Sequence, residues 1–351
     1  MKNMKIIDLF CGCGGLSKGF ENAGFDIVFA IDFWKDAIQT YNKNHIGKVA
    51  HCQDIHELRE DELIGLKRGG VLGVIGGPPC QGYSTVGTRD INDPRNHLYL
   101  EYCRVIETIQ PEFFVLENVK GLITLDGGAF KNDIVDRFSK LGYNVSYKII
   151  NAADCGVPQN RERVFFVGVR HGFFSFPETH CRTVTCAESL GDLPPLDENN
   201  GDAVVYNYIC APQNDYQVKM RCKSIGVFNH QITKHTEQTK SIIALIPDGG
   251  KIKDLPRQYW DVRKYNKAFE RMGSNRPSNT VDTGHRNYFH YVENRIPTVR
   301  ENCRLQSFPD DYIILGSRTS QYKQVGNAVP PLMAQYIAEA IKNHLEATHE
   351  D

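Results

Sequence analysis

The first 170 residues of the chain alternate short apolar runs with longer amphipathic segments. An apolar run of about four to eight residues predicts a buried strand, and apolar residues three or four positions apart predict a helix. We therefore expect strands at residues 5–10, 26–31, 49–52, 71–75, 112–116, 144–150 and 164–169, and helices at 16–23, 35–44, 96–109 and 128–141. This alternation predicts an α/β fold, in which helices cover both faces of a mostly parallel sheet.

The regular pattern fades near His171 and returns after Arg295. The residues between them are rich in Asn, Pro, Gly, Lys, Arg and Tyr and show few clear periods. We expect a first domain at residues 1–175, a smaller irregular domain at 176–294, and a segment at 295–351 that returns to complete the first domain. A final helix over residues 332–345 can begin at the preceding prolines and would pack on the first domain.

The composition is that of a soluble globular protein, because 41% of the 351 residues are hydrophobic and 24% are charged. No apolar run approaches the roughly 20 residues needed to cross a bilayer, so no membrane association is expected. The amino-terminal segment is too short and too acidic for a signal peptide, so the eleven cysteines are expected to be reduced thiols in an intracellular protein. No Cys-x-x-Cys pair occurs, and no metal site is expected.

The net charge of −1 conceals an uneven distribution. Residues 204–300 contain 16 Lys and Arg against 8 Asp and Glu, so this part carries +8 and the remainder −9. A basic segment joined to an acidic one indicates contact with a polyanion, whereas a solvated cationic surface is the alternative.

One cysteine occupies a position where α/β folds place their chemistry. Cys80 follows the predicted strand at 71–75, within the run Gly-Gly-Pro-Pro-Cys-Gln-Gly-Tyr-Ser. The prolines fix the backbone before the thiol, and the glycines let another molecule approach closely. Cys80 is therefore a candidate nucleophile, with a packing role as the alternative.

A glycine-rich turn follows the first predicted strand, in the run Asp-Leu-Phe-Cys-Gly-Cys-Gly-Gly-Leu at residues 8–16. Such a turn lets backbone amides reach a ligand, but this one does not fit the dinucleotide pattern Gly-x-Gly-x-x-Gly. Asp32 ends the second strand and Asp54 follows the third. Because an acidic residue after the second strand usually holds a ribose diol, the order of these motifs predicts a nucleoside cofactor.

Three further motifs follow along the chain: Glu117-Asn118-Val119, Gln159–Arg163, and Gln324–Pro331. Singly, they could be a strand-end salt bridge, a charged strand start and a helix cap. In their order with Asp8-Leu9-Phe10, the Cys80 run and the segment 300–309, they resemble the DNA cytosine-C5 methyltransferases over nearly the whole chain. Members of that family transfer a methyl group from S-adenosylmethionine to carbon 5 of cytosine.

The resemblance implies a Rossmann-like S-adenosylmethionine-dependent methyltransferase fold with a smaller irregular target-recognition domain. Cys80 would add to carbon 6 of a flipped-out cytosine and make carbon 5 nucleophilic. Glu117 would bond ring nitrogen 3 and the exocyclic amine, while Arg163, with Arg161 near it, would hold the ring carbonyl. The base that removes the carbon 5 proton is not assigned.

By motif match, the cofactor site would include Phe10, Gly12, Gly14, Asp32, Phe33, Asp54, Ile55, Pro79 and Asn327. The family usually has glutamate where this chain has Asp32, and the shorter side chain alters the reach to a ribose. The segment 81–97 resembles the family's mobile loop that closes on DNA. Contacts to double-stranded DNA are expected from Gln81, Ser84, Arg89, Arg271, Arg276, Thr280, His285 and Arg286.

The compact length resembles a prokaryotic or phage enzyme of a restriction–modification system, whose cognate endonuclease would act separately. The protein is expected to work as a monomer on DNA, in the cytoplasm and at the nucleoid. One alternative is a transfer RNA cytosine-5 methyltransferase on the same scaffold. A second is a binding protein without catalysis, which the presence of Cys80, Glu117, Arg161 and Arg163 disfavours.

Overall fold

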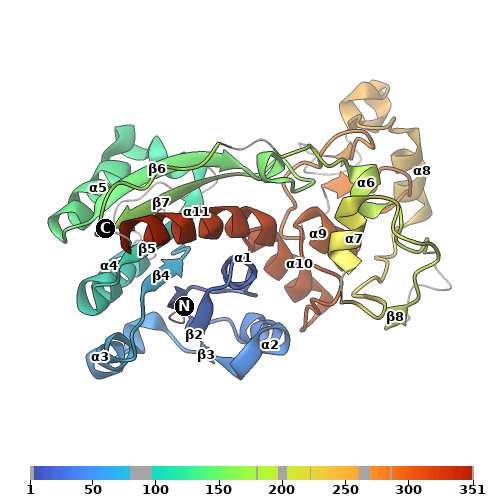
Figure 1. The fold of residues 1–351 in the computed structure, drawn as a ribbon. Coiled ribbons are helices and arrows are strands. Elements are labelled where there is room, and N and C mark those ends of the chain that lie inside the picture. Colours follow the sequence, from blue (N-terminus) through green and yellow to red (C-terminus); the bar gives the residue numbers. More distant parts are fainter. Residues whose placement is uncertain are drawn as a thin grey trace. The chain divides into compact units, whose positions relative to one another are not determined.

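The computed structural model describes residues 4–79, 97–178, 181–196, 204–221, 223–260, 269–284 and 287–349. The chain divides into two compact units (Figure 1). The first comprises Met1–Asn151, Glu162–Thr179 and Pro331–Asp351, and the second comprises Ala152–Arg161 and His180–Pro330. These limits differ from the expected domain boundaries, because residues 295–330 group with the second unit and only the segment from Pro331 returns to the first.

The first unit is built on one seven-stranded sheet with the order β3-β2-β1-β4-β5-β7-β6. Its strands are β1 (Lys5–Leu9), β2 (Asp26–Asp32), β3 (Ala50–Cys52), β4 (Gly73–Gly76), β5 (Phe113–Val119), β6 (Asn144–Asn151) and β7 (Glu162–Val169). The pairings among β1 to β5 are parallel, whereas β7 runs antiparallel to both β5 and β6. The predicted mostly parallel sheet is confirmed.

Helices cover both faces of this sheet. They are α1 (Gly15–Asn22), α2 (Lys35–Asn44), α3 (Glu60–Arg68), α4 (His97–Ile109), α5 (Ala129–Lys140) and α11 (Pro331–His349), with short 3-10 turns at η1 (Ile46–Lys48), η2 (Ile55–Glu57), η5 (Lys120–Ile123) and η6 (Leu125–Gly128). Helix α3 was not predicted from the sequence. Only Leu63 in it is fully buried, so its apolar periodicity is weak.

The core of the first unit has two sides. Phe114 of β5 packs with Phe138 of α5 and Tyr102 of α4, in a cluster that also includes Leu63 of α3. On the opposite face, α1 and α11 pack so closely that a Cβ atom on Gly19 would lie 2.3 Å from the Ala334 Cβ atom. Glycine is therefore required at that crossing.

The second unit consists of short elements. They are η7 (Ala152–Cys155), α6 (Cys186–Leu190), β8 (Val205–Tyr206), α7 (Asp215–Arg221), β9 (Val227–Phe228), α8 (Glu237–Leu245), η8 (Ile252–Asp254), η9 (Arg257–Tyr259), β10 (Glu270–Arg271), β11 (Tyr288–Phe289), α9 (Val299–Leu305) and α10 (Arg318–Asn327). Strand β8 pairs with β9 and β10 pairs with β11, so regular sheet is scarce among its described residues.

Buried ion pairs hold the interior of the second unit and explain why α9 belongs to it. Arg304 is fully buried and lies 2.5 Å from Asp310 and 3.0 Å from Asp192. The pairing of Arg295 with Glu301, at 2.7 Å, lowers the pKa of Glu301 against the opposing effect of burial. Because an unpaired buried charge is costly, these side chains fix α9 within the second unit.

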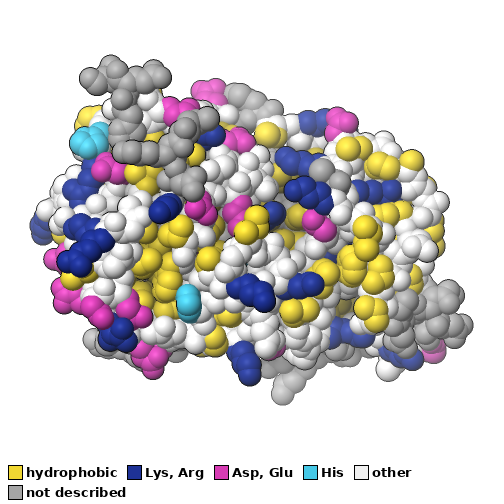
Figure 2. Space-filling model, turned by 60° about the horizontal axis from the view of Figure 1, so that its bottom comes forward, with side chains coloured by type: hydrophobic (Ala, Val, Ile, Leu, Met, Phe, Trp, Pro, Cys, Tyr) yellow, Lys and Arg dark blue, Asp and Glu magenta, His cyan; other side chains and the backbone are white. Residues whose placement is uncertain are grey.

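Burial also reduces the surface charge expected from the basic segment. Arg271, Arg295 and Arg300 are among the cations counted there, and all three are buried. The face drawn in Figure 2 mixes Lys and Arg side chains with Asp and Glu side chains, without one sign covering it. None of the described helices is both long and apolar enough to span a membrane.

Candidate active site

Two of the predicted catalytic residues meet at one end of the sheet in the first unit. The Arg163 Nε atom lies 3.1 Å from the Glu117 Oε1 atom, and their side chains are only 16% and 12% exposed. The antiparallel direction of β7 explains this contact, because Arg163 near the start of β7 pairs with Val119 at the end of β5. A carboxyl group and a guanidinium are thus held together in a mostly buried position.

The segment after β4 is fixed against this pair. A Cβ atom on Gly77 would lie 2.9 Å from the Glu117 Oε2 atom, so this residue has no room for a side chain. Asn118 Nδ2 donates to the Pro78 carbonyl at 3.0 Å, and its own Oδ1 accepts from the Val119 backbone at 2.8 Å. Asn118, which was not among the predicted site residues, therefore fixes the prolines that lead to Cys80. In the sequence, the position of Asn118 directly after Glu117 was the one feature that could have indicated this role.

Several predicted site residues lie outside the described residues. They are Cys80, Gln81, Ser84, Arg89, His285 and Arg286. Their roles remain predictions from the motifs.

The glycine-rich turn after β1 has an unusual backbone that Asp32 supports. Phe10, Gly12 and Gly14 all have positive φ, at +61°, +52° and +90°. The Asp32 carboxylate at the end of β2 accepts from the Gly12 amide at 2.9 Å and from the Trp34 amide at 2.8 Å. Burial raises the pKa of Asp32, while these amides oppose the rise. A left-handed aromatic residue such as Phe10 is uncommon and is typical of functional turns.

The remaining predicted cofactor residues of the first unit differ in how far they are exposed. Phe33 is 70% exposed beside Asp32, so its ring is available to stack on a planar group. Asp54 is exposed and caps η2, accepting from the His56 amide at 3.0 Å, which lowers its pKa. Ile55 is buried in the core, and its carbonyl accepts from the Leu58 amide and from Arg104, so its predicted contact with the cofactor stays a prediction. Pro79 follows directly on the anchored Pro78 and is half-buried.

Arg161 and Asn327 belong to the second unit. Arg161 is 2% exposed, and its Nη2 atom lies 3.4 Å from the Asn327 carbonyl oxygen. Asn327 is exposed at the end of α10. Burial inside this unit favours a positioning role for Arg161, while the predicted role of Arg163 at the ring carbonyl stays a prediction.

The predicted DNA contact at Arg271 needs correction. This side chain is buried, and all five of its N–H groups are used inside the second unit. They donate to the carbonyl oxygens of Ile243, Ile246, His290 and Val292 and to the Asn294 side chain. Arg271 therefore holds its surrounding loops together and cannot contact a phosphate.

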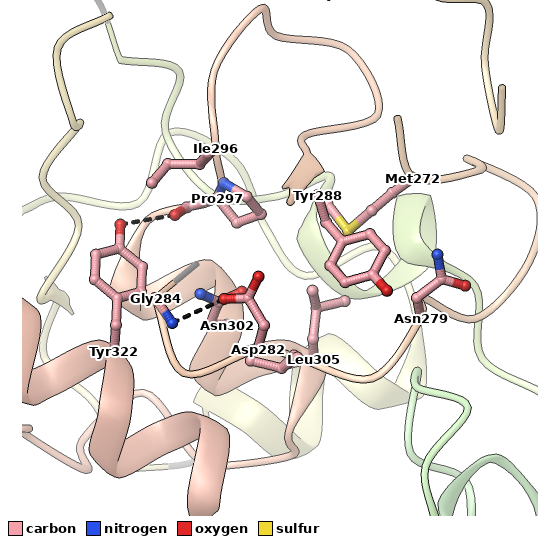
Figure 3. A pocket seen from close by; sticks show the side chains of 11 residues that line it. Met272, Asn279, Asp282, Gly284, Tyr288, Ile296, Pro297, Asn302, Leu305 and Tyr322 are labelled. Atoms are coloured by element: carbon pink, nitrogen blue, oxygen red, sulfur yellow. Dashed lines mark hydrogen bonds between the residues drawn. The ribbon is translucent and has the colours of Figure 1, made fainter. Parts of the chain in front are cut away.

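The other described DNA candidates lie near the surface. Arg276 is exposed and donates to the Gly249 carbonyl at 2.8 Å. The Thr280 hydroxyl donates to the Asn160 carbonyl at 2.7 Å. The segment that contains Thr280 forms part of the wall of a hollow that is lined by Asn279, Asp282, Tyr288 and Asn302 (Figure 3). The Asp282 carboxylate there is held by the Gly284 amide at 2.8 Å.

A buried carboxyl group, not predicted from the sequence as a site residue, lies beneath the glycine-rich turn. Asp8 is fully buried in β1; its Oδ2 accepts from the Ser17 hydroxyl at 2.6 Å, which in turn accepts from the Tyr41 hydroxyl at 2.8 Å. The Asp8 Oδ1 atom has no hydrogen-bond partner within the described part of the chain. Burial raises the pKa of Asp8 to about 7, opposed by the bond from Ser17 and assisted by the charge of Asp32.

We expect the substitution Asp8→Asn to flatten the pH dependence of stability between about pH 4 and pH 7. In that range folded Asp8 keeps a proton that the unfolded chain has released. The free energy of unfolding therefore falls as the pH rises, by up to roughly 4 kcal/mol. Thermal unfolding at a series of pH values measures the slope, with exposed Asp154→Asn as the control. Equal slopes for Asp8→Asn and the unsubstituted protein would contradict the assignment.

Known proteins are similar to this chain over nearly its whole length. Residues 4–343 match the C-5 cytosine-specific DNA methylase family. The Type II methyltransferase M1.HphI of Haemophilus parahaemolyticus is 38% identical, over 97% of this chain and 87% of its own. M.DdeI of Desulfomicrobium norvegicum is also 38% identical, over 98% and 89%.

A solved structure extends the likeness to the fold. It is a prophage-encoded Escherichia coli protein described as a DNA modification methyltransferase, with 26% identity and a TM-score of 0.81. The alignment covers 98% of this chain and all of that one. The match over nearly the whole sequence, together with the paired Glu117 and Arg163, shows that the chain belongs to the C-5 cytosine-specific DNA methylase family.

Proposed function

We propose that this enzyme methylates carbon 5 of one cytosine within a specific duplex DNA sequence, as the modification enzyme of a restriction–modification system. The observation that carries this proposal is the Glu117–Arg163 pair, which lies beside the anchored Gly77-Pro78-Pro79 segment that leads to Cys80. A nucleophile, a carboxyl group and a guanidinium are the three groups that activation of cytosine needs.

The reaction requires carbon 5 to become nucleophilic. A thiolate at Cys80 would add to carbon 6 of the ring and produce an enamine that can attack through carbon 5. Glu117 would stabilise the altered ring at nitrogen 3 and accept from the exocyclic amine. Arg163 positions Glu117 through Nε, and its Nη1 atom donates to the Glu162 carbonyl at 2.8 Å. Its remaining N–H groups would be the donors for the ring carbonyl oxygen. Elimination of the thiolate and loss of the carbon 5 proton would complete the cycle.

The first unit fits S-adenosylmethionine, which when bound supplies the methyl group. Asp32 is held in place by two backbone amides, and each of its oxygens can accept a further bond from a ribose hydroxyl. Exposed Phe33 would stack on the adenine ring. The positive-φ turn at Phe10, Gly12 and Gly14 would bring backbone amides to the part of the cofactor beyond the ribose and adenine. The proposed cofactor-binding residues also include Asp54, Ile55, Pro79 and Asn327.

The second unit would recognise the DNA sequence. Exposed Arg276, with His285 and Arg286 in the following segment, would contact DNA, and Gln81, Ser84 and Arg89 would act near the flipped base. We propose a monomer on DNA, located in the cytoplasm and at the nucleoid, with a cognate endonuclease acting separately. The relatives M1.HphI and M.DdeI, both Type II methyltransferases, support the restriction–modification part of this proposal.

Transfer RNA is the alternative substrate. A Schizosaccharomyces pombe protein named Dnmt2 shares the fold, but at 18% identity and a TM-score of 0.59 it is more distant than the Type II enzymes. Methyl transfer from labelled S-adenosylmethionine to duplex DNA and to transfer RNA, assayed side by side, decides between them. We expect label only in duplex DNA, and bisulfite sequencing then identifies the modified cytosine. Label confined to transfer RNA would overturn the proposed function.

A further inference from the structure

Residues 158–161, which precede Arg163 in the chain, are hydrogen-bonded within the second unit to residues 277–281. We call residues 277–281 the recognition segment, because they belong to the region proposed to recognise DNA. The Asn160 amide donates to the Ser278 carbonyl at 2.8 Å, and the Ser278 amide donates to the Pro158 carbonyl at 3.0 Å. Gln159 and Ser278 form a parallel bridge. Residues 158–161 and 277–281, more than a hundred positions apart in sequence, therefore run side by side.

Two side chains reinforce this pairing. The Thr280 hydroxyl donates to the Asn160 carbonyl at 2.7 Å, and the Val281 amide donates to the Gln159 Oε1 atom at 2.8 Å. Gln159 is fully buried, and its Nε2 atom donates to the Gln306 Oε1 atom at 2.8 Å. A displacement of the recognition segment would break several of these bonds at once unless residues 158–161 moved with it.

The same network reaches the end of α10. The Gln306 Nε2 atom donates to the Val325 carbonyl at 2.6 Å, and Arg161 lies on the Asn327 carbonyl at 3.4 Å. Residues 158–161 thus join the recognition segment to Asn327, one of the proposed cofactor residues. Along the chain, Arg161 is separated from Arg163 by a single residue.

We propose that Thr280 and Gln159 are positioning residues that transmit the placement of the recognition segment on DNA to Arg163, an inference that rests on the proposed function. The Thr280 hydroxyl has one proton, which is directed at the Asn160 carbonyl and not outward. Its donor is therefore not available to a phosphate oxygen, and Thr280 would act through residues 158–161 in place of the predicted donation to DNA.

The substitutions Thr280→Val and Thr280→Ser test this role, because valine keeps the shape and loses the donor, whereas serine keeps the donor. We expect Thr280→Val to lower the single-turnover rate of methyl transfer to cognate duplex about three- to tenfold, the effect of one hydrogen bond. The dissociation constant for DNA should change less than about twofold. Thr280→Ser should retain most of the rate.

The control is Thr319→Val, an exposed threonine of α10 that should leave both quantities unchanged. Melting temperatures show whether each variant is folded. A wild-type rate for Thr280→Val would overturn the inference. So would weaker DNA binding with an unchanged rate, which indicates a direct contact, or equal loss for serine and valine, which indicates packing. Absence of DNA methylation by the unsubstituted enzyme would instead refute the proposed function.

Discussion

Replacement of Cys80 by serine should abolish both methyl transfer and covalent capture of DNA that contains 5-fluorocytosine. A fluorine at carbon 5 cannot leave as a proton does, so the adduct at carbon 6 persists in the unsubstituted enzyme. Serine is a far weaker nucleophile at neutral pH because its hydroxyl stays protonated. We expect the rate to fall on the order of 10³-fold or more, as when other covalent nucleophiles are removed.

The adduct is measured as a protein–DNA complex that survives denaturing electrophoresis. The matched control is Cys181→Ser, because Cys181 is an exposed free thiol elsewhere in the chain. That variant should form the adduct as the unsubstituted enzyme does. An adduct with Cys80→Ser would show that another residue is the nucleophile.

Loss of the Arg163 guanidinium should have the next largest effect. In Arg163→Ala, the Glu117 carboxylate loses the partner that lies at 3.1 Å, and the ring carbonyl of the substrate loses its proposed donor. Removal of one donor that stabilises developing charge typically costs about 10²–10³ in kcat. Arg163→Lys should recover only part of the rate, since an ammonium group does not reproduce the planar fork of donors.

Single-turnover methyl transfer measures this loss, and binding of S-adenosylmethionine should stay within about twofold because the cofactor residues are separate. Lys120→Met serves as the control, since Lys120 is an exposed cation that pairs with exposed Glu162. A rate for Arg163→Ala close to that of Lys120→Met would remove Arg163 from the catalytic set.

The sequence predicts the centre of the sheet in the first unit well because strands β1, β4, β5 and β7 are mostly buried and consist largely of apolar residues. It misses α3, in which Leu63 is the single fully buried residue. The segment 295–330 was expected to complete the first domain. It groups with the second unit because Arg304 pairs with buried Asp192 and Arg300 donates to the Phe228 carbonyl, a preference that local periodicity does not reveal.

For the site, too, the sequence predicts residues that belong to local motifs but not contacts between residues far apart in the chain. The motifs placed Glu117 and Arg163 in one catalytic set, and the structure shows that the two side chains lie in contact, while their roles toward the substrate stay predictions. A count of charges could not show that every N–H group of the Arg271 side chain donates to a neighbouring carbonyl or side-chain oxygen. Nor could it show that Asp8 is buried with a raised pKa, since that depends on how α1 and α2 pack over β1.

The pairing of residues 158–161 with 277–281 has a consequence for exchange of recognition regions between relatives. A chimera that replaced only residues 180–330 would join a foreign recognition segment to the native residues 158–161, and the bond to the Asn160 carbonyl would form only where the foreign segment has a hydroxyl at the position of Thr280. The exchangeable block is discontinuous and includes residues 152–161. If the second unit recognises the DNA sequence as proposed, we expect recombination that alters the methylated sequence to work best when both pieces come from the same parent.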